Sequence, residues 1–231
     1  MDAAAAARDL VRARFPDARL TLLAGSTARG TATATSDLDI VVILDGPPAP
    51  YRETLRLDGR LVELFVQTPE STRLCWVREA AERRNTLADM CAYGITLTGA
   101  EAAAALRDEA TAFLAAGAPA LTPAELARRR YALTDGLDDL ADATDPGERD
   151  AIAGIVLVAA AELALLADRR WLGRGKWLVR RLRDHDPAVA DRLLAAHRRA
   201  VAEGDPGDLT AAADEVLARV GGRLTAGYHA T

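Results

Sequence analysis

The chain has 231 residues, 50% of them hydrophobic and 27% charged, a composition typical of a globular protein with one large domain or two small ones. Its formal net charge is −5 and its pI is about 5.3, so no overall basic field attracts a polyanion, and a nucleic-acid partner is not expected. Cys75 and Cys91 form no CxxC pair and have no nearby histidine, which argues against a disulfide framework or a structural zinc site and suits a cytoplasmic protein.

The first part of the chain carries both helix and strand signals. The spacing predicts, in chain order, a helix at 1–14, strands at 19–24, 37–44, 54–57 and 60–67, helical structure at 69–93, and a short strand at 95–97. The first helix lacks the apolar core and cleavage site of a signal peptide. Asp58-Gly59, between two alternating runs, is a strong β-hairpin signal. We therefore expect an α/β (α+β) N-terminal domain with a small mixed sheet.

The second part of the chain is predicted to be helical throughout. From Glu101 onward the sequence is rich in Ala, Leu, Arg and Asp with helical spacing, and several prolines interrupt it. These are Pro119, Pro123, Pro146, Pro187 and Pro206. The pattern predicts an all-α helical bundle of about four or five helices. We place the domain boundary near residue 99, which gives domains 1–99 and 100–231.

The segment Gly25-Ser26-Thr27-Ala28-Arg29-Gly30 follows a strand and is a candidate phosphate-binding loop. Gly25 permits a tight turn, and Ser26 stands where a helix begins, so that free backbone N–H groups and hydroxyls face a phosphate. Arg29, one turn further on, adds a positive charge. The loop matches neither GxxxxGK[ST] nor GxGxxG, the two familiar phosphate-loop patterns. Ser26 is not expected to be a hydrolase nucleophile because the sequence has no GxSxG elbow.

Three acidic residues are candidate metal ligands. Asp37 and Asp39 are two residues apart on a strand, so their side chains leave the same face with Cα atoms about 7 Å apart. Carboxylates so arranged bind hard cations, usually Mg²⁺ shared with substrate phosphates. Glu63 interrupts an otherwise apolar strand. If that strand lies beside Asp39, the cluster can hold two ions about 4 Å apart, a geometry suited to in-line phosphoryl displacement. The alternative is that Glu63 faces water on an edge strand.

Together, Gly25-Ser26, Asp37-Leu38-Asp39 and the later Glu63 resemble the nucleotidyltransferase superfamily, which includes polymerase beta and the aminoglycoside and lincosamide adenylyltransferases. The resemblance covers residues 20–67. It implies the superfamily fold, Mg²⁺ as cofactor, and transfer of a nucleoside monophosphate from a nucleoside triphosphate, with ATP as the expected nucleotide. Family members often use Asp as the third carboxylate, so Glu63 departs from the pattern.

Two residues of the helical part are further candidates. Lys176 is the only lysine of the chain and follows Gly173-Arg174-Gly175. It is a candidate ligand of the triphosphate, and the alternative is an ordinary surface lysine at a helix start. Glu162 lies inside the strongly apolar run 152–167, which is short for a membrane span and is expected to be a buried helix, without a membrane role. Glu162 is a candidate general base, for which the family offers a precedent; the alternative is a structural pair with an arginine.

The expected acceptor is a hydroxyl of a small molecule, such as an aminoglycoside-like compound, because the second domain is large enough to wall a pocket. Two alternatives stay open: a protein hydroxyl, as in the adenylylating antitoxins of the superfamily, or a non-catalytic nucleotide-binding module. Four acidic residues of one helix share a face: Asp135, Asp138, Asp139 and Asp142. Such a face is usually solvated, but it would favour a cationic acceptor if it lined the cleft. The sequence does not predict the oligomeric state.

Overall fold

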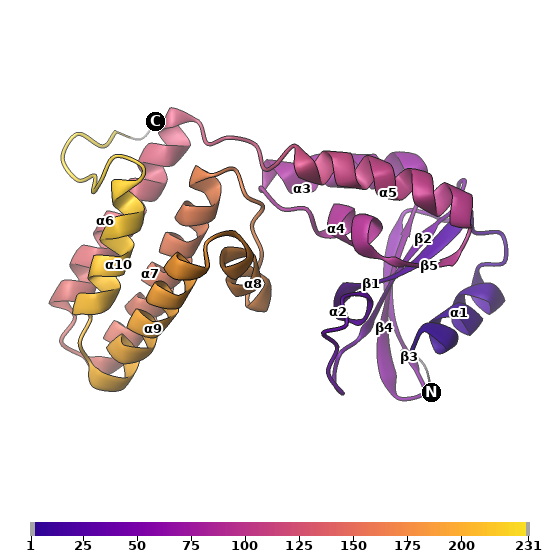
Figure 1. Cartoon of the computed structure of the whole chain (residues 1–231), viewed down its shortest axis with the longest axis horizontal. Helices are drawn as coiled ribbons and strands as arrows, with labels where there is room; N and C mark the ends of the chain where they lie inside the picture. The colour runs from indigo at the N-terminus through magenta and orange to yellow at the C-terminus, as the bar shows by residue number, and fades with distance from the viewer. Residues whose placement is uncertain (1–2, 230–231) are drawn as a thin grey trace. The chain divides into compact units, whose positions relative to one another are not determined.

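The computed structural model describes residues 3–229 and divides the chain into two compact units (Figure 1). The first unit extends to Gly117 and contains the sheet, and the second begins at Ala118 and is helical. The predicted fold class, a small mixed sheet with helices followed by a helical region, is therefore confirmed. The predicted boundary at residue 99 lies inside the first unit.

The first unit contains a five-stranded sheet with the order β3-β4-β2-β1-β5. Its strands are β1 (Leu20–Ala24), β2 (Leu38–Ile43), β3 (Tyr51–Leu57), β4 (Arg60–Gln67) and β5 (Ile95–Thr98). β2 and β4 are parallel and the other neighbouring pairs are antiparallel. Each strand overlaps a predicted one, because alternating or continuous apolar runs and the Asp-Gly turn marked them in the sequence.

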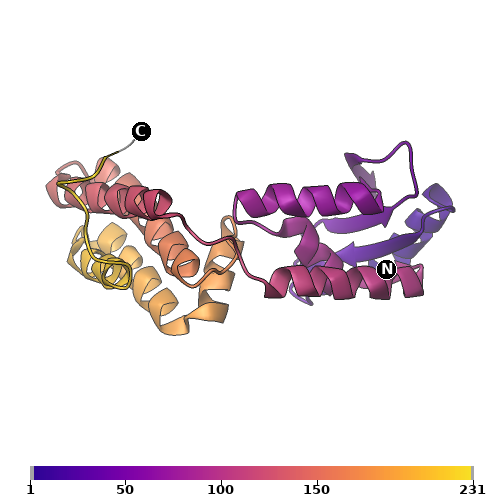
Figure 2. The ribbon, with the colours of Figure 1, turned by 90° about the horizontal axis from the view of Figure 1, so that it is seen from above.

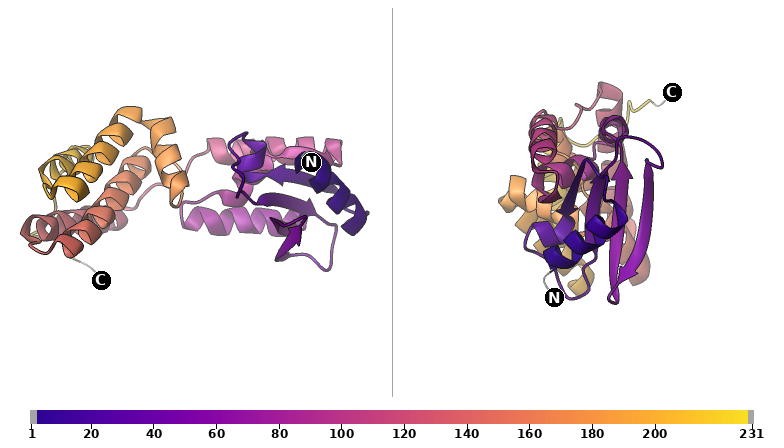
Figure 3. Two further views of the ribbon diagram at one scale, coloured as in Figure 1. Left: turned by 90° about the horizontal axis from the view of Figure 1, so that it is seen from below. Right: turned by 90° about the vertical axis from the view of Figure 1, so that its right-hand side faces the viewer.

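Helices cover both faces of this sheet. α1 (Ala3–Arg14) packs on one face through Ala7 and Val11, and Figure 3 shows it lying against the strands. The other face is covered by α3 (Pro69–Ala81), α4 (Thr86–Tyr93) and α5 (Ala100–Ala115). Figure 2 shows α3 and α5 running beside one another, and an ion pair of 2.5 Å between Arg73 and Glu109 joins them. Strand side chains therefore alternate between two buried layers.

The helical segment predicted at 69–93 is two helices in the structure. The chain leaves α3 through Arg83, whose φ is 57°, in the left-handed region. The Arg84 N–H donates back to the Glu79 carbonyl at 2.8 Å, and the Arg83 N–H donates to the Ala80 carbonyl at 2.8 Å, the pattern of a Schellman stop. Glycine usually occupies this position, so an arginine gave no signal for the break.

α5 belongs to the first unit, although the sequence placed it in the helical domain. Its buried residues Ala103, Leu106 and Ala110 share a core with β1, β2 and α4. Phe113 of α5 also packs against Trp76 of α3, with ring centroids 5.5 Å apart. Helical composition alone could not show which unit this helix covers, and for that reason the compact units divide between Gly117 and Ala118 rather than near residue 99.

The second unit is built from five helices within the described residues. They are α6 (Pro123–Asp142), α7 (Pro146–Ala167), α8 (Lys176–His185), α9 (Pro187–Glu203) and α10 (Gly207–Ala218). Three of the predicted proline breaks are helix starts, since proline stands in the first turn of α6, α7 and α9. Thr122, Asp145 and Asp186 cap these three helices by accepting backbone N–H groups.

α7 is the central helix of the second unit. Eight of its residues are buried, and they form part of one core with α6, α8, α9 and α10. By length and composition alone α7 is also apolar enough to cross a membrane, and 44% of its most apolar stretch is buried in the unit. Ile155 and Val158 are exposed on its remaining side. The sequence predicted a buried helix here, and α7 is buried on one face and exposed on the other.

Candidate metal centre

Strand register brings the candidate residues together. In the antiparallel pair, Ala24 of β1 lies opposite Asp39 of β2, so that Gly25 follows directly beside Asp39. In the parallel pair, Asp39 lies opposite Glu63 of β4. Leu38 and Ile40 face the α1 side of the sheet, so Asp39 between them faces the other side. Glu63 faces that same side, since Val62 and Leu64 also point toward α1.

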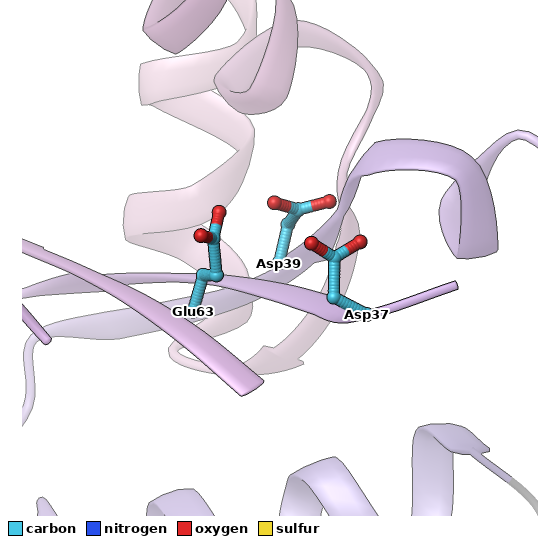
Figure 4. A group of neighbouring side chains, drawn as sticks. All are labelled: Asp37, Asp39 and Glu63. Carbon is cyan, nitrogen blue, oxygen red and sulfur yellow. The ribbon is translucent and has the colours of Figure 1, made fainter. Parts of the chain in front are cut away.

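Asp37, Asp39 and Glu63 form one cluster at this point (Figure 4). One carboxylate oxygen of each residue lies within 4.8 Å of the other two, and all three residues are half-buried. The donors are all carboxylate oxygens, the set that Mg²⁺ and Mn²⁺ prefer. Three like charges this close repel one another, and a divalent cation shared among them would offset that repulsion. The residues present therefore fit a divalent metal site.

Gly25 is required where Asp39 approaches the turn. It begins the one-turn helix α2 (Gly25–Ala28) with a φ of 65°, which is left-handed. A Cβ atom at Gly25 would overlap the Asp39 carboxylate. A side chain here would therefore be excluded both by backbone conformation and by the acidic group it would meet. Ser26, the next residue, is 6% exposed.

Asp37 is held by the loop that precedes β2. The Arg60 Nε donates to the Ser36 carbonyl at 2.8 Å, which fixes the backbone next to Asp37. The Ser36 hydroxyl accepts from the Thr33 N–H, also at 2.8 Å. Sequence reasoning did not identify Arg60, because nothing in a linear pattern shows that the start of β4 reaches this loop.

Glu63 has an arginine partner that sequence reasoning also missed. Arg52 of β3 donates from Nη2 to Glu63 Oε2 at 2.6 Å. The β-hairpin places Thr54 opposite Glu63 and Arg52 opposite Phe65, so Arg52 is a diagonal neighbour of Glu63 on the same face. The Asp-Gly turn sets this register, and counting back from it could have found the pair.

Arg29, predicted to contact phosphate, is held by α4. Its Nη2 donates to Asp89 Oδ2 at 2.5 Å, and its guanidinium lies 4.5 Å from the centroid of the Tyr93 ring. These contacts fix the end of the Gly25–Gly30 loop on α4. A phosphate role for Gly25, Ser26 and Arg29 stays a prediction, and any such role of Arg29 must accommodate its contact with Asp89.

The two candidates of the helical part lie in the second unit. Glu162 of α7 pairs with Arg129 of α6 at 3.0 Å, the structural arrangement that was the alternative to a general base. The pair lies at a hollow of ≈ 470 Å³ that is also lined by Ile155 and Val158. Lys176 is exposed and is the first residue of α8. The roles predicted for Glu162 and Lys176 remain predictions.

The acidic face of α6 is exposed to solvent. All four of its aspartates are exposed: Asp135, Asp138, Asp139 and Asp142. Asp138 accepts from Arg223 at 3.0 Å, and Arg223 also bonds Asp214 at 2.7 Å. Part of this face thus holds the C-terminal segment in place, in keeping with the solvated interpretation.

A family model and a solved structure are similar to this chain. The family model described as "Nucleotidyltransferase domain" matches residues 5–84. A solved structure, a nucleotidyltransferase-like protein from Exiguobacterium sibiricum 255-15, is similar with 14% sequence identity and a TM-score of 0.46, over 94% of this chain and 73% of that chain. No protein of curated function matches the sequence significantly. The similarity to a nucleotidyltransferase domain therefore covers residues 5–84, which lie within the first unit.

Proposed function

We propose that the chain is a Mg²⁺-dependent nucleotidyltransferase that transfers a nucleoside monophosphate, with ATP as the expected donor, to a hydroxyl of a small-molecule acceptor and releases pyrophosphate. The observation that carries this proposal is the meeting of Asp37, Asp39 and Glu63 within 4.8 Å, beside the turn at Gly25. The domain match supports general nucleotidyl transfer. Neither finding identifies the acceptor.

In this proposal each residue has a defined task. Asp37, Asp39 and Glu63 hold the divalent ions, and the ions when bound neutralise the triphosphate and favour ionisation of the acceptor hydroxyl. Gly25 and Ser26 offer backbone N–H groups at the start of α2 to the phosphates, and Arg29 adds positive charge near them. Most of the rate acceleration then comes from positioning and charge neutralisation, as in other phosphoryl transfers.

The second unit is the proposed source of acceptor contacts. Its α6–α7 surface carries a hollow of ≈ 470 Å³ with apolar walls and the Arg129–Glu162 pair. The volume suits a small molecule. Glu162 remains the proposed general base only if an acceptor separates it from Arg129. Lys176 remains a proposed triphosphate ligand. The cytoplasm, which supplies nucleoside triphosphates and Mg²⁺, is the proposed location.

The direct test is Mg²⁺-dependent pyrophosphate release with ATP and a panel of aminoglycosides and other polyhydroxylated acceptors. Asp39→Asn keeps the size of the side chain and removes its charge, so we expect activity to fall by at least about 100-fold. Asp45→Asn is the matched control. Asp45 lies beyond the other end of β2, with a 75% exposed side chain that contacts Arg19 at 3.4 Å. This variant should keep full activity.

The same experiment separates the alternatives. Transfer of labelled nucleotide from α-labelled ATP to a protein, with no small molecule labelled, would support the protein-modifying alternative. Equal nucleotide binding by the wild type and Asp39→Asn, with no pyrophosphate released by either, would leave a binding module and refute the enzymatic proposal.

A further inference from the structure

The edge strand β3 places a positive charge directly on the third carboxylate of the cluster. Arg52 Nη2 lies 2.6 Å from Glu63 Oε2, and the Arg52 guanidinium lies 4.6 Å from the centroid of the Phe65 ring. We propose that Arg52 is a built-in counter-cation that competes with a divalent metal ion for Glu63. This inference rests on the proposed function in one respect, because it takes Glu63 to be a metal ligand.

The fold orients Arg52 toward Glu63. Arg52 lies opposite Phe65 in the β3–β4 register, and Glu63 is two residues before Phe65 on the same face of β4. The guanidinium can therefore stack on Phe65 and still reach the Glu63 carboxylate.

Charge balance explains why a counter-cation belongs here. Three carboxylates with oxygens within 4.8 Å of one another repel, and the repulsion is greatest when no metal is bound. Arg52 offsets one of the three charges in that state. A divalent ion that shares Glu63 must approach the same guanidinium, so Arg52 stabilises the metal-free cluster and weakens metal binding.

Solvent limits the size of this competition. The Arg52 side chain is 59% exposed and the Glu63 side chain 24% exposed, so water screens the repulsion between the guanidinium and a bound ion. At the high effective dielectric of such a site, removing the arginine charge should tighten divalent metal binding about tenfold. The negative charges of a bound nucleoside triphosphate would also offset the positive charge of Arg52.

Arg56 provides a matched control on the same strand and the same face. It lies two residues beyond Thr54, the partner of Glu63, and its Nη1 donates to the Gly59 carbonyl at 2.9 Å rather than to a carboxylate of the cluster. Arg52→Met and Arg56→Met each remove one positive charge and keep an unbranched side chain. Arg52→Lys keeps the charge without the planar guanidinium.

The experiment measures Mn²⁺ affinity of the full-length protein without nucleotide, by calorimetry and by electron paramagnetic resonance, together with thermal unfolding. We expect Arg52→Met to bind Mn²⁺ about tenfold more tightly than the wild type, and Arg52→Lys and Arg56→Met to stay within about twofold of it. Arg52→Met should also unfold at a lower temperature without metal and recover most of that loss at saturating Mn²⁺. A purely structural residue would lower stability in both conditions.

The outcomes separate this inference from the proposed function. Unchanged or weaker Mn²⁺ binding by Arg52→Met, or equal tightening by Arg56→Met, overturns the inference. Glu63→Gln should weaken Mn²⁺ binding and remove the effect of a second Arg52→Met change. If Glu63→Gln leaves Mn²⁺ affinity unchanged, the metal centre of the proposed function is wrong, and the inference falls with it. If Glu63→Gln weakens binding and Arg52→Met does not tighten it, only the inference falls.

Discussion

The position of the Asp39 carboxylate depends on the missing side chain at Gly25. The backbone there is left-handed, and a Cβ atom would overlap the carboxylate. Gly30, at the end of the same loop, has the same φ of 65°, but a Cβ atom there would meet open space. A comparison of alanine substitutions at the two glycines therefore separates the cost of backbone strain from the cost of contact with the Asp39 carboxylate.

We expect Gly30→Ala to lower the free energy of unfolding by about 1 kcal/mol, the usual cost of a left-handed non-glycine residue, and to leave Mn²⁺ affinity unchanged. Gly25→Ala should lower stability further and also weaken Mn²⁺ binding, because Asp39 must move away from its partners. Urea unfolding and Mn²⁺ titration measure the two effects. Equal results for the two variants would show that the close approach of Gly25 and Asp39 has no role in the site.

The sequence showed which acidic residues meet, but not what holds them. Asp37, Asp39 and Glu63 were predicted because carboxylates at the start of one apolar strand and within another have few structural explanations. Arg52 and Arg60 were missed, since their contacts depend on hairpin register and on a loop conformation that no local pattern encodes. Residue types predicted that the three carboxylates meet, and only the folded backbone shows how the cluster is supported.

At the scale of single elements, helix starts were easier to predict than helix ends. Prolines marked the first turns of α6, α7 and α9, where capping side chains also stand. The ends of α3 and α7 carry arginine in the left-handed position, Arg83 and Arg169, so the usual glycine signal was absent. The break between α3 and α4 was therefore missed, although helical structure at 69–93 was correctly predicted.

Asp186 allows the contribution of one helix cap to stability to be measured. It accepts from the Val189 N–H at 3.0 Å at the start of α9 and from Arg219 at 2.9 Å. The backbone hydrogen bond, and then Arg219, hold the Asp186 pKa below its ordinary value. At neutral pH we expect Asp186→Ala to lower the free energy of unfolding by about 1–2 kcal/mol.

This contribution should disappear in acid. A lowered pKa in the folded state means that the stabilisation is present above the unfolded-state pKa and is lost as the pH falls through the lower folded-state value. The difference between wild type and Asp186→Ala should therefore shrink below about pH 4. Urea unfolding of both proteins across this range measures it, and a difference that is constant with pH would contradict the assigned hydrogen bonds.

At the scale of the whole molecule, the chain has separate cores in its two units. One core lies among the helices of the second unit, and two others lie on the two faces of the sheet. Composition showed that strands end near residue 99, but strands alone do not define a unit. α5 supplies Ala103, Leu106 and Ala110 to the sheet core, so a unit ending at residue 99 would leave that core open.

Two fragments test this division. Residues 1–117 contain the full sheet, its covering helices and the three carboxylates, so we expect this fragment to fold and to bind Mn²⁺ with the affinity of the whole chain. Residues 1–99 lack α5, and we expect them to aggregate or to lack cooperative unfolding, because the apolar surface under α5 is exposed. Circular dichroism and Mn²⁺ titration compare them. A stable, metal-binding 1–99 fragment would support the boundary predicted from sequence.

The single lysine of the chain makes the second unit chemically addressable. Lys176 is exposed at the first residue of α8, while Cys91 is buried and Cys75 is half-buried. An amine-directed fluorophore or cross-linker would thus modify one side chain, besides the α-amino group, without any engineered cysteine or loss of a native thiol. Lys176 is thus the only side-chain amine to which a spectroscopic label can be attached.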